Sequence, residues 1–279
     1  MKLISPETEN AFNKLKKFLE SIDSVAIAYS GGADSGLLLY LASVTPGLKL
    51  RAYTVNNIMI PEDEIQSAVD FIKRFNINHK IIEMDILSFD QIRINQPDRC
   101  YHCKKIILKK IIEEASTCGI TTVLEGSHSG DIHDFRPGLK AISELGVFSP
   151  LKDADFSREM IHELSGYFSL PSYGKESYPC LATRIPTGTP ITSEQLKKAE
   201  TAEKIIKSFG FRQVRARIHG NILRIEVAEN MIQDIISPQI RNKLYENLIN
   251  AGFTFITLDL KGYRTGSMNL NIEELRERN

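Results

Sequence analysis

Short apolar runs alternate with amphipathic segments along the first 170 residues of the chain. Runs of strand type occupy residues 24–29, 48–55, 79–86 and 121–127. Segments with the apolar spacing of helices occupy residues 35–44, 61–75, 101–116 and 156–168. Strands that alternate with helices predict an α/β fold with a doubly wound parallel sheet, covered on both faces. The ligand site of such a sheet lies at the carboxyl ends of its strands.

The pattern changes after about residue 170, where residues 170–192 carry four prolines and show no periodicity. Beyond this stretch we predict a helix, two strands joined by a Gly220-Asn221 turn, one or two helices and a last strand. These elements cover residues 193–209, 213–220, 222–229, 230–250 and 253–260. The chain is therefore expected to form a first domain over residues 1–172, a linker over 173–190 and a smaller α+β domain over 191–279.

Charge and hydropathy restrict the partners of the protein. Thirty-five basic residues balance thirty-five acidic ones, so that no global field attracts nucleic acid or an anionic membrane. We expect neither as a partner. The N-terminus lacks the apolar run of a signal peptide and no segment has the length of a membrane span, which predicts a cytoplasmic protein. In that reducing compartment the four cysteines are not expected to form disulfides.

The hexamer SGGADS, from Ser30 to Ser35, separates the first predicted strand from its helix. Free backbone N–H groups and the positive end of the helix dipole favour an anion there. Ser30 and Ser35 can donate hydroxyl groups, and Asp34 can hold a cation or cap the helix. A tight strand-to-helix turn without a ligand is the alternative. The hexamer resembles SGGxDS, the pyrophosphate loop of the ATP pyrophosphatase (PP-loop) superfamily.

The PP-loop resemblance implies a nucleotide site in the first domain, with the fold of the adenine nucleotide alpha hydrolases. ATP and Mg²⁺ are the implied ligands, with Ser30, Gly31, Gly32, Asp34 and Ser35 around the phosphates. The ends of the first two strands would hold the adenosine through Ala28, Thr54 and Val55. Residues after the fourth strand, Gly126 and Asp131 among them, would form the second wall.

Two cysteines, Cys100 and Cys103, stand three apart at the start of a predicted helix. The helix dipole and the basic neighbours Arg99, Lys104 and Lys105 favour their thiolate forms. The pair alone fits half of a zinc site, a redox pair, part of an iron–sulfur site or two buried thiols. No second C-x-x-C occurs to complete a zinc site.

The other two cysteines stand alone. Cys118 lies at the apolar end of a helix and is predicted to be part of the core, whereas Cys180 lies in the irregular linker.

Five blocks of the sequence resemble the LarE family of ATP-dependent sulfur transferases, and together they cover most of the chain. They are PDRCYHCKK (97–105), DFRPGLKA (134–141), CLATRIPTGTPIT (180–192), residues 199–227 and TLDLKGYRTGSMN (257–269). The family implies that ATP activates a substrate carboxylate as an acyl-adenylate, which sulfur then converts to a thiocarboxylate. The implied substrate is a small molecule, a pyridinium dicarboxylate mononucleotide on the way to the nickel-pincer cofactor.

The resemblance also implies where the sulfur comes from. In one branch of the family three cysteines hold a [4Fe-4S] cluster whose fourth iron can carry sulfide, and Cys100, Cys103 and Cys180 match that pattern. In the other branch a lone linker cysteine, here Cys180, gives up its own sulfur. We favour the cluster, with sulfide or another sulfur donor supplying it.

The remaining site residues follow from the same blocks. Cys180, Lys104 and Arg184 are the expected catalytic residues, the last two bringing positive charge to the phosphates. Arg136 is a further candidate for binding the substrate, and for Arg136, Lys104 and Arg184 the alternative is a surface or ion-paired position. Arg215 and Arg217 would bind the substrate, since alternate residues of a strand share one face. Their alternative is a solvated sheet face paired with carboxylates. Glu203, Glu226 and Asp234 would hold a divalent metal.

Three other functions remain open from the sequence. They are a tRNA thiolase of the same superfamily, an ATP-dependent amidating ligase, and a nucleotide-binding regulator without chemistry. Neutral net charge counts against the first of them. The small second domain, with its paired apolar faces, is compatible with a homo-oligomer.

Overall fold

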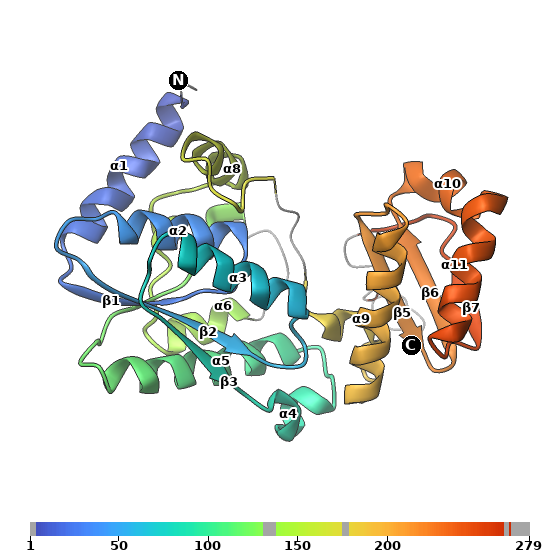
Figure 1. Cartoon of the computed structure of the whole chain (residues 1–279). Helices are drawn as coiled ribbons and strands as arrows, with labels where there is room; N and C mark the ends of the chain where they lie inside the picture. The colour runs from blue at the N-terminus through green and yellow to red at the C-terminus, as the bar shows by residue number, and fades with distance from the viewer. Residues whose placement is uncertain (1–3, 131–137, 175–178, 265–267, 269–279) are drawn as a thin grey trace, which may run out of the picture. The chain divides into compact units, whose positions relative to one another are not determined.

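The computed structural model describes residues 4–130, 138–174, 179–264 and 268. The chain divides into two compact units, drawn in Figure 1. Unit 1 comprises Met1–Asp85 and Asp98–Tyr178, and unit 2 comprises Ile86–Pro97 and Pro179–Asn279. Unit 2 therefore includes a short segment from the middle of the first predicted domain.

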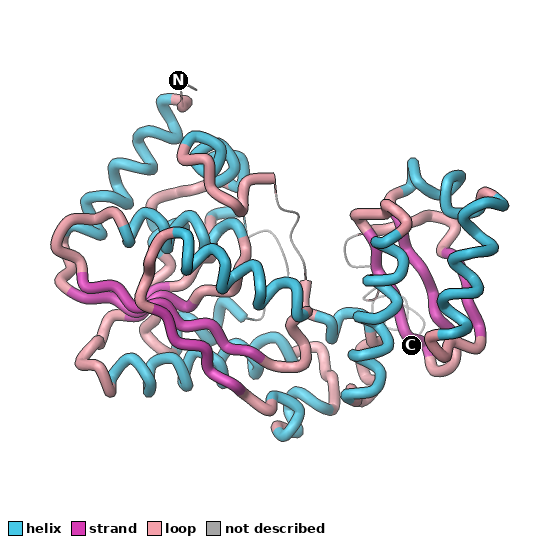
Figure 2. The backbone as a smooth tube through the Cα atoms, viewed as in Figure 1, coloured by secondary structure: helices cyan, strands magenta, loops and turns pink. Residues whose placement is uncertain are grey.

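A four-stranded parallel sheet forms the centre of unit 1 (Figure 2). Its strands are β1 (Ser24–Ala28), β2 (Lys49–Asn56), β3 (His79–Glu83) and β4 (Val123–Leu124). Their order is β3-β2-β1-β4, and each neighbouring pair is parallel. Ala28 at the end of β1 lies opposite Tyr53 of β2, so both strands end at one edge of the sheet. The predicted fold class is confirmed.

Helices cover both faces of this sheet, as Figure 1 shows. One hydrophobic cluster joins β1 to α1 (Pro6–Glu20), α2 (Ala33–Ser43), α3 (Glu62–Arg74), α7 (Pro150–Asp153) and α8 (Arg158–Tyr167). A second cluster joins the sheet to α5 (Arg99–Ser116) and α6 (Gly138–Glu144). The sheet is thus buried on both sides, which explains why its strands read as continuous apolar runs.

Unit 2 contains a three-stranded mixed sheet of β5 (Val214–His219), β6 (Ile222–Val227) and β7 (Phe255–Leu258). β5 and β6 pair antiparallel, and β6 and β7 pair parallel. The helical elements are η1 (Ile86–Ser88), α4 (Asp90–Arg93), η3 (Leu181–Arg184), α9 (Ser193–Ser208), η4 (Glu229–Met231), α10 (Ile232–Ile236) and α11 (Pro238–Asn250). Thr192 and Gln195 form a capping box that fixes the start of α9.

The structure adds elements that the hydrophobic pattern did not predict. α1 is one of them, and its Leu15 and Leu19 are fully buried. The prediction that Cys118 is part of the core is wrong, because this cysteine follows the end of α5 and its side chain is exposed. In the described part of the chain, no helix combines the length and apolarity needed to cross a membrane.

Candidate active site

The SGGADS loop connects β1 to α2 in unit 1, as the sequence predicted. Gly31 has φ +82°, a conformation that favours glycine, and a Cβ there would lie 3.2 Å from the carbonyl oxygen of Glu64. The Ser35 Oγ donates to the Gly32 carbonyl at 3.3 Å and lies 3.1 Å from the Ser30 Oγ. Ser30 is exposed. The loop therefore presents a hydroxyl group to solvent in front of a helix N-terminus.

The segment after β4 packs closely against this loop. A Cβ on Gly126 would lie 2.7 Å from the backbone nitrogen of Ser35, so only glycine fits there. His128 is buried, and its Nε2 lies 3.9 Å from a carboxylate oxygen of Asp34. The structure thus brings together Gly126 and Ser35, two residues that the sequence assigned to opposite walls of the site. Asp131 lies outside the described residues.

Lys104 of α5 reaches the same wall. Its Nζ donates to the buried Glu125 Oε2 at 2.8 Å and to the Ser127 Oγ at 3.4 Å. The backbone N–H of Ser127 and the hydroxyl of Ser149 also donate to Glu125. Burial acts to raise the pKa of Glu125, but the Lys104 charge and these hydrogen bonds outweigh it and lower the pKa below its ordinary value. Ser149 carries no motif signal and was missed.

The residues predicted to hold the adenosine differ in exposure. Thr54 and Val55 are buried, and the Thr54 Oγ1 donates to the Tyr29 carbonyl at 2.8 Å. Ala28 is half-buried. A cavity of about 320 Å³ adjoins the loop and is lined by Tyr29, Gly31, Ser67, Asp70, Phe71, Arg74, Pro171 and Ser172. It opens on the α3 side of the loop.

Cys100 and Cys103 are the second and fifth residues of α5, which confirms that the pair lies near a helix start. Cys100 is exposed and Cys103 is half-buried. An Arg99 guanidinium nitrogen lies 3.9 Å from the Cys100 Sγ. Lys105, by contrast, points to Tyr101 and Glu144 and forms ionic and hydrogen-bonded contacts with them.

Cys180 directly precedes η3 in unit 2 and is half-buried. None of the four cysteines is paired in a disulfide, and a thiolate sulfur is a metal ligand. Two of the predicted cluster ligands belong to unit 1 and the third belongs to unit 2.

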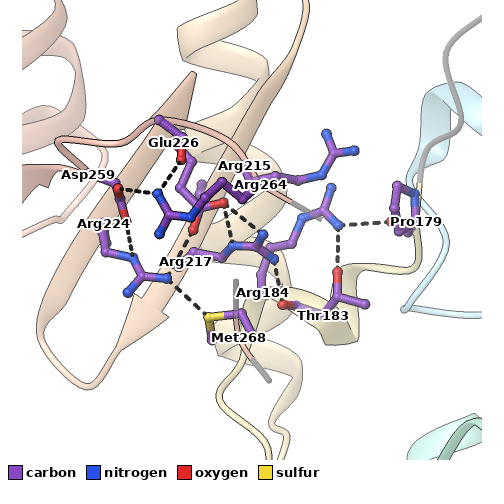
Figure 3. Close-up of polar contacts among 12 residues, drawn as sticks. Pro179, Thr183, Arg184, Arg215, Arg217, Arg224, Glu226, Asp259, Arg264 and Met268 are labelled. Carbon is purple, nitrogen blue, oxygen red and sulfur yellow. Dashed lines mark hydrogen bonds and ion pairs between the residues drawn. The ribbon is translucent and has the colours of Figure 1, made fainter. Parts of the chain in front are cut away.

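Unit 2 contains a group of charged residues that we call the arginine cluster (Figure 3). Its members are Arg184, Arg215, Arg217, Arg224, Arg264, Glu203, Glu226 and Asp259. In the β5–β6 register Arg215 lies opposite Glu226, and Arg217 lies opposite Arg224. Arg217 donates to Glu226 Oε2 from Nε at 3.1 Å and from Nη2 at 2.8 Å. Arg215 and Arg217 are only 4% and 5% exposed, so this sheet face is buried.

Arg184 is fully buried beneath this sheet face. Its Nε and Nη2 donate to the two carboxylate oxygens of Glu203 at 2.7 and 3.0 Å. Burial and the charges of two neighbouring arginines lower the pKa of Arg184 to about 9. Burial raises the pKa of Glu203 to about 7. The predicted role of Arg184 at the phosphates stays a prediction, since these contacts lie within unit 2.

The predicted divalent metal residues do not come together in the described structure. Glu203 and Glu226 turn their carboxylates to guanidinium groups, and Asp234 is exposed on α10. Within either unit, as far as it is described, no three His, Cys, Asp or Glu side chains are arranged to hold a metal ion. Arg136 lies outside the described residues.

Comparison with known proteins decides the family. The chain is 34% identical over 252 residues to the pyridinium-3,5-bisthiocarboxylic acid mononucleotide synthase of Lactiplantibacillus plantarum. The matched region covers 90% of this chain and 91% of the synthase. The chain belongs to the LarE family of sulfur transferases. LarE relatives also include the uncharacterised protein slr1717 of Synechocystis sp., 31% identical over 94% of this chain and 97% of the relative. The uncharacterised protein MJ0830 of Methanocaldococcus jannaschii is 30% identical over 91% of this chain and 95% of its own length. A search against protein-family models found no match.

LarE membership confirms the resemblance that the five sequence blocks indicated. Those blocks include the Cys100 pair, the Cys180 segment and the β5–β6 arginines. One residue of the Cys180 block was overlooked: Thr183, whose carbonyl accepts a hydrogen bond from Arg217 at 2.8 Å. Its place one residue before Arg184 was the signal that could have found it.

Proposed function

We propose that this LarE protein is an ATP-dependent sulfur transferase that adenylylates a substrate carboxylate and replaces one of its oxygens with sulfur. The substrate is a pyridinium dicarboxylate mononucleotide and the product is a thiocarboxylate. The reaction also releases AMP and pyrophosphate. The observation that carries the proposal is the similarity, over nine-tenths of both chains, to a synthase named for a bisthiocarboxylic acid mononucleotide.

The loop geometry supports ATP as the activating substrate. The substrate carboxylate attacks the α-phosphorus, and the bond between the α-phosphorus and the pyrophosphate oxygen breaks. Backbone N–H groups of the loop, the hydroxyl of Ser30 and the N-terminus of α2 stabilise the charge on the departing pyrophosphate. Asp34 would hold Mg²⁺, which would supply further positive charge to the phosphates. Lys104 stands beside Gly126 and Ser127 on the adjoining wall and adds a positive charge there. Sulfide then attacks the acyl carbon of the adenylate, and the bond to AMP breaks.

The sulfur atoms of Cys100, Cys103 and Cys180 fit an iron–sulfur cluster by donor type. Cys100 and Cys103 are the second and fifth residues of one helix, and Cys100 is exposed. These three cysteines would hold a [4Fe-4S] cluster with one iron left without a protein ligand, and the cluster would supply the sulfide for transfer. Binding of the mononucleotide phosphate by Arg215 and Arg217 stays a prediction, because both side chains are buried and Arg217 already donates to Glu226 and to the Thr183 carbonyl. Arg136 is a further candidate.

Anaerobic purification followed by iron, sulfide and spectral analysis tests the sulfur source. We expect about four irons per chain and a broad absorption band near about 400 nm. Serine variants of Cys100, Cys103 and Cys180 should each lose iron. The exposed Cys118→Ser variant is the matched control and should retain it. A colourless wild-type protein in which Cys180 becomes dehydroalanine after one turnover would reject the cluster and show that Cys180 is the sulfur donor.

Turnover assays test the reaction itself. Pyrophosphate and a thiocarboxylate should form only when ATP and the dicarboxylate mononucleotide are both present. Pyrophosphate release without any thiocarboxylate, or unchanged turnover in a variant that lacks all three cysteines, would reject sulfur transfer and favour an amidating ligase. Salt-sensitive binding of tRNA would favour a tRNA thiolase instead.

A further inference from the structure

We infer that Glu203, Arg184 and Arg217 are positioning residues that hold the backbone of the Cys180 turn in place, and that they act on sulfur transfer through Cys180. The turn consists of residues 179–184. This inference deepens the proposed function, because the importance of Cys180 rests on it. The residues involved all belong to unit 2.

Arg184 binds the turn on both sides of the cysteine. Its Nη1 donates to the Pro179 carbonyl at 3.0 Å and to the Cys180 carbonyl at 3.4 Å. It also donates to the Thr183 Oγ1 at 2.7 Å, and that hydroxyl in turn donates to the Cys180 carbonyl at 2.9 Å. One guanidinium therefore fixes the peptide groups before and after Cys180, a residue that is half-buried. Figure 3 shows the contacts to Pro179 and Thr183.

Glu203 of α9 fixes the direction of Arg184. Its carboxylate accepts two hydrogen bonds from Arg184, and its Oε1 also accepts one from the Ala216 N–H of β5 at 3.0 Å. Glu203 is 1% exposed and Arg184 is not exposed at all. Paired hydrogen bonds of this kind set the plane of a guanidinium as well as its position. The remaining nitrogen of the Arg184 guanidinium, Nη1, is therefore directed toward the backbone of the turn.

Arg217 anchors the other end of the turn to the sheet. Its Nη1 donates to the Thr183 carbonyl at 2.8 Å, while its Nε and Nη2 bind Glu226 of β6. The turn is thus tied to α9 through Arg184 and to β5 and β6 through Arg217. These contacts use carboxylate oxygens that a divalent ion at Glu203 and Glu226 would need. The arrangement therefore fits arginine pairing and not a metal at these two residues.

The thiol reactivity of Cys180 tests this inference without ATP or substrate. The full-length protein is reduced, treated with an iron chelator and alkylated with iodoacetamide, and mass spectrometry follows Cys180 with Cys118 of the same sample as the reference. We expect alkylation of Cys180 to rise about threefold or more in Glu203→Gln and Thr183→Val, because the turn opens more often. Arg224→Met removes a guanidinium of the same cluster that contacts Glu226 and Asp259, and should stay within about twofold of wild type.

Each outcome decides the question. Thr183→Val removes only a hydroxyl group, so it remains informative if Glu203→Gln does not fold. An effect seen in the melting temperature but not in Cys180 alkylation would show a merely structural role and overturn the inference. Equal increases in Arg224→Met would also overturn it. Because the assay involves no turnover, loss of sulfur transfer in the wild type would reject the proposed function and leave this result standing.

Discussion

The wall that adjoins the SGGADS loop in unit 1 and the arginine cluster in unit 2 each contain a buried carboxylate bound by a basic side chain, but the pKa values of the two carboxylates shift in opposite directions. Glu125 has a lowered pKa because Lys104 and several hydrogen-bond donors outweigh its burial. Glu203 has a pKa raised to about 7 because burial dominates. The loop presents Ser30 to solvent, whereas Arg184 is fully enclosed. Hydrogen-bond donors at the surface can therefore bind a ligand, whereas the donors of buried ion pairs are used within their own unit.

The largest effect is expected from Glu203→Ala. It leaves Arg184 buried without its carboxylate, and breaking such a pair costs about 3–5 kcal/mol. Hydrogen exchange should therefore accelerate in α9 and β5 but not in the sheet of unit 1. Lys198→Met, which breaks an exposed ion pair with Glu194 on the same helix, is the control and should change little. Equal effects of both variants would contradict the contrast between the units.

Gly126→Ala should affect the loop of unit 1. The added Cβ overlaps the backbone of Ser35, and overpacking of this kind costs about 1–3 kcal/mol. We also expect ATP to bind about tenfold more weakly, because the first turn of α2 must shift. Thermal melts and calorimetric titration with ATP measure the two effects. Gly32→Ala is the control for stability, since its Cβ meets only the Ser30 Oγ at 3.4 Å.

Lys104→Met should show whether the lowered pKa of Glu125 depends on its cation. The carboxylate stays buried but loses its charged donor, which costs about 1–2 kcal/mol. Lys105→Met, on the same helix, breaks a contact with Glu144 that water can replace and should cost less. Thermal unfolding of the two variants under identical conditions gives the comparison. A larger loss in Lys105→Met would contradict it.

The smallest effect concerns pH. Since the folded-state pKa of Glu125 is lowered from 4.5, its carboxylate stabilises the fold above that pH, and the contribution is lost as the pH falls. Glu125→Gln should therefore melt below wild type at neutral pH, and the difference in melting temperature should narrow as the pH falls below 4.5. Glu144→Gln, at an exposed carboxylate in unit 1, should show a smaller change. A difference in melting temperature that widens on acidification would contradict the lowered pKa of Glu125.

Much of the fold could be read from the hydrophobic pattern. The apolar run at residues 24–29 became β1 and SGGADS became the loop before α2, because both signals are local. The amphipathic N-terminus was recognised without being assigned to a helix, and α1 forms because Leu15 and Leu19 find a core that other segments build. Cys118 was misassigned, since an apolar neighbourhood in sequence did not show that the helix ends two residues earlier.

The sequence by itself determined the family, the loop, the position of each cysteine and the alternation of Arg215 and Arg217, because motifs and strand periodicity are local properties. Only the tertiary structure decided which charge meets which. Lys104 of α5 forms an ion pair with Glu125, which follows β4. Arg184 forms an ion pair with the buried Glu203 and is not exposed. The physical reason is that a buried charge must find a partner in space, and that partner is chosen by packing between segments far apart in the chain.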